Sequence, residues 1–172
     1  MLTVLGIILV LFSCIAFAVM KIASARERIG TTRQMRDVLK RMADQISFTM
    51  EPLPDILSRI SQEELGETGE FLDELASQLK NSENRSLQEV WHSTLDSYAK
   101  KLGLSARTIS ILSGLGERLG RMSRDIELDN ISYTIEELDG EIEAEQALFT
   151  KNEKLFRSFG VLVGILIVIL FI

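Results

Sequence analysis

Residues 123–145 read SRDIELDNISYTIEELDGEIEAE, and this stretch decides the fold class. Its apolar side chains are spaced alternately three and four residues apart, which is the spacing of a helix seam that packs against partner helices. The seam residues are Leu128, Ile131, Ile135, Leu138 and Ile142. From about Ser123 the chain has no proline, and it has only Gly140 before Gly160. The pattern predicts one long helix that begins near Ser123 and continues towards the C-terminus.

The same stretch carries nine acidic side chains and no basic one between Asp125 and Glu145. Most charge runs are solvated helix faces, but this one lacks the basic residues at i,i+4 that would stabilise a helix. Two interpretations stay open: a solvated face, and a surface that binds a basic region of a cytoplasmic partner. The candidate partner-binding residues are Asp125, Glu127, Asp129, Glu136, Glu137, Asp139 and Glu141.

Upstream of this stretch, helical periodicity recurs and strand alternation is nearly absent. Thr31 or Thr32 can cap a helix whose apolar stripe extends from Met35 to Ile46. We expect this helix to end at the corner formed by Pro52 and Pro54, because proline disfavours helix at the preceding residue.

The following segments are separated by glycine and capping signals. Gly66 and Gly69 mark one break, and residues 86–89 (SLQE) form a capping box that starts a helix with Trp91 on its buried face. Gly103 ends that helix, and the next begins nearby at residue 105. The sequence therefore predicts an all-α protein whose central part is an antiparallel bundle of about six helices.

The two ends of the chain are apolar. All 19 Lys and Arg and all 25 Asp and Glu lie between Lys21 and Arg157. We expect an N-terminal transmembrane anchor at residues 1–22, a cytoplasmic helical domain at 23–156 and a C-terminal transmembrane segment at 157–172. A cleavable signal peptide is the alternative for the first segment, and a buried core helix is the alternative for the last.

Basic side chains flank both apolar segments on the inward side, so the positive-inside rule places the central domain in the cytoplasm. These membrane-flanking residues are Lys21, Arg26, Arg28, Lys151, Lys154 and Arg157. Anionic lipid headgroups explain the basic stretch after the first segment better than nucleic acid does, because the chain is acidic overall. Gly160 and Gly164 form a G-x-x-x-G that can pack the two spans together or make a dimer, which leaves a homo-oligomer open.

Residues that could carry chemistry are few. The chain has one histidine, His92, and one cysteine, Cys14, which lies in the first apolar segment. These two cannot form the usual zinc ligand sets or a Cys–His nucleophile pair. Residues 114–120 (GLGERLG) have the wrong glycine spacing for a nucleotide loop and predict close helix packing and a turn at Gly120. We expect no catalytic residue, cofactor or metal, no nucleophile–base constellation, and no enzyme.

Several short stretches, taken in order, resemble one family. They are residues 33–36 (RQMR), 52–57 (PLPDIL), Trp91, 112–120 (LSGLGERLG) and 153–160 (EKLFRSFG). Together they look like the stage III sporulation protein AB family of endospore-forming bacteria. That family is similar to the inner-membrane platform proteins of type II secretion and type IV pilus machines, whose cytoplasmic domains are small helical bundles.

The resemblance implies a non-enzymatic platform in the channel between mother cell and forespore, located in the outer forespore membrane on the mother-cell side. It also implies a cytoplasmic partner, the secretion-type ATPase stage III sporulation protein AA, together with other membrane proteins of the channel complex. The alternative function is a two-span membrane sensor or receptor, which would place its ligand domain outside the cell.

Overall fold

The computed structural model describes residues 2–49, 51–81, 85–120 and 123–171, with side chains described for residue 20 and for 23–49, 51–81, 85–120 and 123–151. Over these residues the chain forms six helices and no strand. The helices are α1 (Leu2–Phe48), α2 (Leu53–Glu63), α3 (Glu67–Asn81), α4 (Leu87–Tyr98), α5 (Ala106–Arg118) and α6 (Arg124–Phe171). The predicted all-α class is confirmed, and so is the long last helix.

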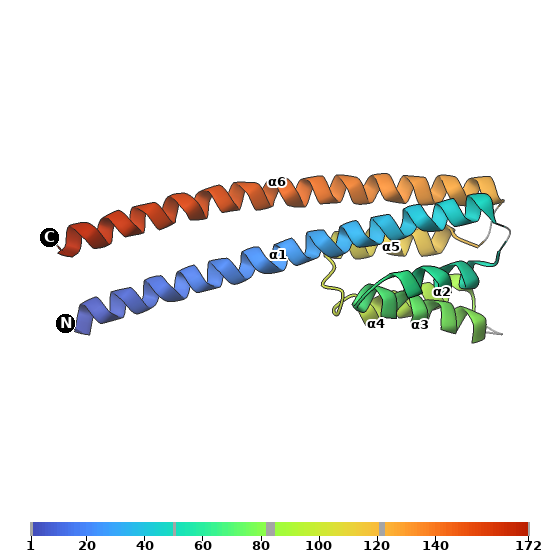
Figure 1. The fold of residues 1–172 in the computed structure, drawn as a ribbon, viewed down its shortest axis with the longest axis horizontal. Helices are drawn as coiled ribbons and strands as arrows, with labels where there is room; N and C mark the ends of the chain where they lie inside the picture. The colour runs from blue at the N-terminus through green and yellow to red at the C-terminus, as the bar shows by residue number, and fades with distance from the viewer. Residues whose placement is uncertain (1, 50, 82–84, 121–122, 172) are drawn as a thin grey trace. The chain divides into compact units, whose positions relative to one another are not determined.

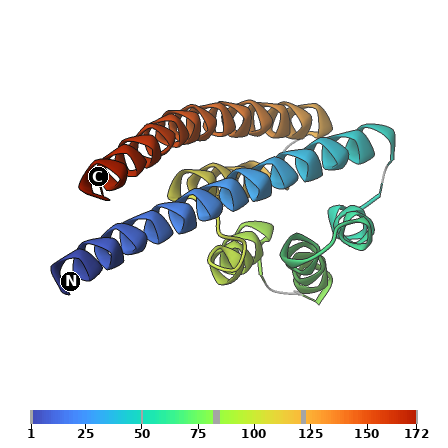
Figure 2. The same ribbon diagram turned by 60° about the vertical axis from the view of Figure 1, so that its left-hand side comes forward.

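The chain divides into two compact units, one formed by Arg28–Ile142 and the other by Met1–Glu27 with Glu143–Ile172. Helices α1 and α6 contribute to both units, and each continues without interruption through the residues where the predicted domain boundaries fall. In the unit Arg28–Ile142, consecutive helices run in opposite directions (Figure 1). Helices α2, α3 and α4 lie side by side in both views (Figures 1 and 2). We refer to this unit as the bundle.

The predicted helix start at Thr31 or Thr32 is wrong, because both residues lie inside α1. The Thr32 side chain is fully buried, and its hydroxyl donates a hydrogen bond of 2.9 Å to the Arg28 carbonyl four residues earlier. A threonine caps a helix only where the backbone N–H groups two or three residues after it have no helical partner. Here the residues before Thr32 are already helical, so their carbonyls accept from those N–H groups. Nothing in the sequence before Thr31 stops the helix, since no proline precedes it.

The other predicted helix boundaries are confirmed, with two exceptions, one of which is that α4 ends at Tyr98 and not at Gly103. Ser86 and Glu89 form the capping box of α4, and Pro52 is the N-cap residue of α2. The chain turns at Gly66 with a φ of 73°, but Gly69 lies within α3. A Cβ atom at Gly69 would lie 2.5 Å from the Glu64 carbonyl oxygen. This glycine therefore permits a close backbone approach and does not break the helix.

Trp91 lies at the centre of the packing between α3, α4 and α5. Its indole Nε1 donates a hydrogen bond of 2.8 Å to the Leu112 carbonyl, and its ring packs edge-on against Phe71, with ring centroids 6.5 Å apart. A Cβ atom at Gly116 would lie 2.3 Å from Trp91 Cδ1, and Gly120 has a φ of 78°. The interpretation of residues 114–120 as a close helix contact followed by a turn is thus confirmed.

Candidate partner-binding surface

The inner face of α6 holds this helix in the bundle through its apolar seam. Ile131 and Leu138 are fully buried, and Ile142 is 5% exposed. Leu128 and Ile135 are half-buried. The predicted seam is therefore confirmed, and it fixes which side chains of α6 point towards the bundle and which point away.

Two of the candidate partner-binding carboxylates pair with basic side chains of the bundle. Asp139 on α6 accepts a hydrogen bond of 2.8 Å from Arg36 Nη1 on α1. Glu137 lies 3.7 Å from Arg107 Nη2 on α5. The hydrogen bond to Asp139 is the main cause that raises the pKa of Arg36 above its ordinary value, with a further contribution from Asp37. For these two carboxylates, the basic partners that residues 125–145 lack are thus supplied by α1 and α5.

A third candidate carboxylate ends a chain of hydroxyl groups. Ser105, the N-cap residue of α5, donates a hydrogen bond of 3.0 Å to Glu141 Oε1. The Ser105 hydroxyl lies 3.0 Å from Thr108 Oγ1, which in turn lies 3.3 Å from Thr32 Oγ1. Thr32 and Thr108 are fully buried. The chain therefore links α1, α5 and α6 through polar groups that all have partners, as burial requires.

A fourth candidate, Glu127, accepts a hydrogen bond of 2.9 Å from the Gly120 backbone N–H and so closes the turn between α5 and α6. Glu127, Glu137, Asp139 and Glu141 thus have structural partners within the bundle. Part of the acidic run therefore serves contacts within the bundle.

The remaining three candidates lie on the opposite side of α6. Asp125, Asp129 and Glu136 are exposed and form no hydrogen bond or ion pair with any residue whose side chain is described. Ile126 and Tyr133 lie between them in sequence and are 44% and 53% exposed. The Tyr133 ring lies at the edge of this group, because the Arg118 guanidinium of α5 lies 5.3 Å from its centroid. We call these five residues the outer face of α6. Apolar side chains interleaved with unpaired carboxylates are the composition expected where a basic, partly apolar partner surface binds.

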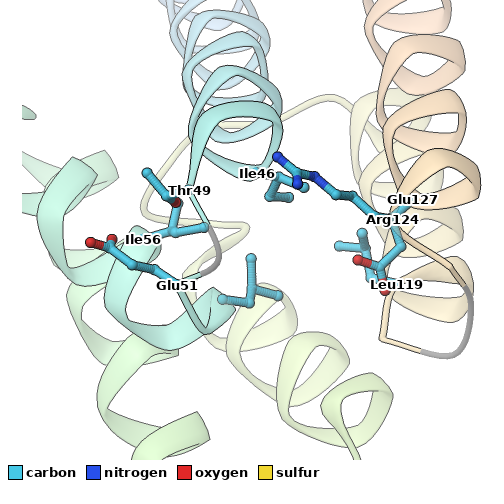
Figure 3. A pocket seen from close by; sticks show the side chains of 8 residues that line it. Ile46, Thr49, Glu51, Ile56, Leu119, Arg124 and Glu127 are labelled. Carbon is cyan, nitrogen blue, oxygen red and sulfur yellow. The ribbon is translucent and has the colours of Figure 1, made fainter.

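A cavity of about 280 Å³ lies at the end of the bundle where α1 ends, α2 begins, α5 ends and α6 begins (Figure 3). Its lining residues are Ile46, Thr49, Glu51, Leu53, Ile56, Leu119, Arg124 and Glu127. No local sequence pattern indicates this cavity, because its lining comes from two stretches that lie far apart in the chain, residues 46–56 and residues 119–127. Only the shared position of these residues at helix ends, next to predicted turns, could have indicated it.

The expectation that no nucleophile–base pair exists is wrong as a matter of geometry. His92 Nδ1 on α4 lies 2.8 Å from Ser113 Oγ on α5, and His92 Nε2 lies 3.9 Å from Glu117 Oε1. Acyl transfer also needs free donors for the developing oxyanion. Ser113 lies inside α5, where backbone N–H groups are used in the helix, so this pair lacks the usual backbone oxyanion donors. His92 itself is half-buried.

The predicted membrane-flanking residues are placed only in part. Arg28 and Lys151 are exposed, and the Arg26 guanidinium lies 5.6 Å from the centroid of the Phe149 ring. The side chains of Lys21, Lys154 and Arg157, and the helix-packing positions Gly160 and Gly164, lie outside the residues whose surroundings the structure describes.

Neither predicted membrane segment is tested by side-chain structure. Apart from residue 20, residues 1–22 and 157–172 lie outside those whose side chains are described. Within the described part of the chain, no helix is long and apolar enough to cross a membrane. The described residues also contain no group of three or more His, Cys, Asp or Glu that could hold a metal ion.

Comparison with known proteins gives one consistent result. The family model of stage III sporulation protein AB matches residues 3–172. The Bacillus subtilis (strain 168) stage III sporulation protein AB is 28% identical over 145 residues, which are 84% of this chain and 84% of that protein. A solved structure of a stage III sporulation protein AB has a TM-score of 0.67 at 20% identity and covers 72% of this chain and 97% of its own. At that identity the structural likeness shows a shared fold.

Proposed function

Because the chain belongs to the stage III sporulation protein AB family, we propose that it is a non-enzymatic membrane platform of the channel complex between mother cell and forespore. In this proposal the bundle lies in the cytoplasm and binds the secretion-type ATPase stage III sporulation protein AA. The apolar ends anchor the chain in the outer forespore membrane beside other channel proteins. Residues 1–20 and 158–172 contain no Asp, Glu, Lys or Arg, which supports the anchors.

The outer face of α6 is the observation that carries the proposal. The seam and the contacts of Glu137, Asp139 and Glu141 hold α6 firmly in the bundle. Its opposite side then presents Asp125, Asp129 and Glu136 to solvent in a fixed arrangement. A rigid, pre-arranged charged surface favours binding, because little conformational entropy is lost when the partner binds. The partner surface that fits it is basic.

The proposal assigns no catalytic role to the chain. A platform needs only a stable surface and an anchor. The long helix α6 extends from the bundle towards the C-terminal apolar segment, and in the proposal it transmits small tilts caused by the ATPase to the membrane.

Charge reversal on the outer face tests the proposal. The variant Asp129→Lys with Glu136→Lys is introduced into the full chain carrying an affinity tag, in cells that are sporulating. We expect recovery of the ATPase with this variant to fall by about tenfold or more, since like charges then face each other across the interface. The matched control reverses Asp73 and Asp96, which are exposed on α3 and α4 and change the net charge equally.

Equal recovery of the ATPase with both variants and with the wild type would contradict the assignment of the outer face. Loss with both variants would show a general charge effect and would also contradict it. A separate measurement tests the anchors: the chain should remain in the membrane fraction after carbonate extraction, and release into the supernatant would contradict the proposed membrane location.

A further inference from the structure

The cavity at the end of the bundle has walls that are apolar and a rim that is polar. Ile56 and Leu119 are buried, and Ile46 and Leu53 are half-buried beside them. Figure 3 shows Arg124 extending from the start of α6 towards Ile46 near the end of α1. A volume of about 280 Å³ leaves room for a whole side chain, since one water molecule takes about 30 Å³ in the liquid.

Each polar residue of the rim already has a partner within the chain. The Arg124 guanidinium donates to the Ser47 carbonyl, and the Thr49 hydroxyl donates a hydrogen bond of 2.8 Å to the Gln45 carbonyl. Glu51 pairs with Arg59.

The fourth, Glu127, accepts from the Gly120 N–H. With its polar groups engaged in this way, the cavity offers a ligand mainly apolar contact. This composition favours an aliphatic or aromatic group and disfavours a metal ion or a small charged ligand.

The surface beside the cavity also carries apolar side chains next to an acidic one. Phe48, which lies between the cavity residues Ile46 and Thr49 in sequence, is 87% exposed. Ile126, beside Glu127, is 44% exposed and belongs to the outer face of α6. Asp125 follows Arg124 in the first turn of α6 and is unpaired among the described residues. An apolar cavity next to exposed apolar side chains and free carboxylates matches the pattern of a buried anchor with a charged rim.

From these observations we infer that the cavity receives an aliphatic or aromatic side chain of a basic segment of the protein that binds the outer face of α6. The inference rests on the proposed function and adds the position of the anchor residue to it. The basic side chains of the segment meet Asp125 and Asp129, and its apolar anchor contacts Ile46, Leu53, Ile56 and Leu119. A second copy of this chain fits less well, because it would bring the same unpaired carboxylates to the interface.

The test fills the cavity with a larger side chain and leaves its apolar lining residues unchanged. Thr49 lies half-buried at the rim, so Thr49→Trp places an indole in the volume that the anchor needs. The matched control is Gln62→Trp, an exposed position in the last turn of α2, at the other end of that helix from the cavity residue Leu53. Thr49→Phe is a milder second variant for the case in which the indole disturbs folding, which circular dichroism reports.

The measurement is calorimetric titration of the ATPase into the full chain in detergent at several temperatures. We expect wild type and Gln62→Trp to bind with a negative heat-capacity change, which is the marker of apolar burial. Thr49→Trp should weaken binding about tenfold or more and make the heat-capacity change less negative. The variant Asp129→Lys with Glu136→Lys should also weaken binding, but its heat-capacity change on binding should equal that of the wild type.

Each of the other possible results contradicts a different part of the inference. Unchanged binding by folded Thr49→Trp and Thr49→Phe, together with loss on charge reversal, would overturn the cavity assignment and leave the outer face standing. Self-association of the wild type that Thr49→Trp abolishes would assign the cavity to a second copy instead. No binding of the ATPase by the wild type would overturn the proposed function and this inference with it.

Discussion

On the inner face of α6, Glu137, Asp139 and Glu141 each contact a side chain from α5, from α1 or from the cap of α5. On the outer face, Asp125, Asp129 and Glu136 are exposed and unpaired among the described residues. The same side-chain type, on one helix and within about twenty residues, thus serves two purposes. An acidic run in one helix therefore divides into structural and exposed carboxylates according to the direction in which each side chain points.

The largest expected difference between the two faces is in stability. Leu138 is fully buried in the seam, so Leu138→Ala should lower the free energy of unfolding by about 2–5 kcal/mol. Tyr133→Ala on the outer face should lower it by about 1 kcal/mol or less, because it removes only a partly exposed contact with the Arg118 guanidinium. Denaturant unfolding of the full chain in detergent, followed by circular dichroism at 222 nm, measures both. Equal losses would show that the outer face is also buried by protein.

The second prediction concerns the buried hydroxyl chain on the inner side. Thr108→Val removes the hydroxyl between Thr32 and Ser105 and should destabilise the bundle by about 1 kcal/mol, since both neighbours keep another partner. Thr150→Val on an exposed turn of α6 is the control, because it removes a hydroxyl that bonds only to the Gln146 carbonyl. A neutral Thr108→Val would show that the chain does not contribute to joining the helices.

The smallest expected effects compare one paired and one unpaired carboxylate. Asp139→Asn breaks the ion pair with Arg36 and should cost about 0.2–1 kcal/mol, because both side chains are partly solvated. Glu136→Gln should leave stability unchanged within error. Thermal unfolding at low and at high salt distinguishes the two variants. High salt should reduce the loss of stability caused by Asp139→Asn and should not affect Glu136→Gln. The reverse order of effects would mean that the two faces of α6 are misassigned.

Much of the fold could be predicted from local patterns. The alternating spacing of Leu128, Ile131 and Leu138 is enough to place the seam, and the capping box of residues 86–89 fixes the start of α4. The helix start at Thr31 or Thr32 was predicted wrongly because a threonine before an apolar stripe gives the same sequence pattern at the start of a helix and inside a longer one. Only the absence of a preceding break distinguishes the two cases.

The candidate site could be predicted less completely, for two physical reasons. The heptad separation of Asp129 and Glu136, opposite the seam, could have marked the outer face from the sequence. By contrast, the partners of Asp139 and Glu137 are Arg36 and Arg107, which lie 103 and 30 residues away in the chain. Contacts of that kind, like the lining of the cavity, depend on tertiary packing and leave no local signal.

The assignment of the outer face is tested most directly by the salt dependence of partner binding, compared between variants of the two faces. The ATPase is titrated calorimetrically into the full chain, its Asp139→Asn variant and its Asp129→Lys, Glu136→Lys variant, each at low and high salt. We predict that wild type and Asp139→Asn bind alike and weaken with salt, because exposed charge pairs are screened. The outer-face variant should bind weakly at both salt concentrations. Salt-dependent binding that survives reversal of Asp129 and Glu136 would show that the partner does not bind the outer face of α6.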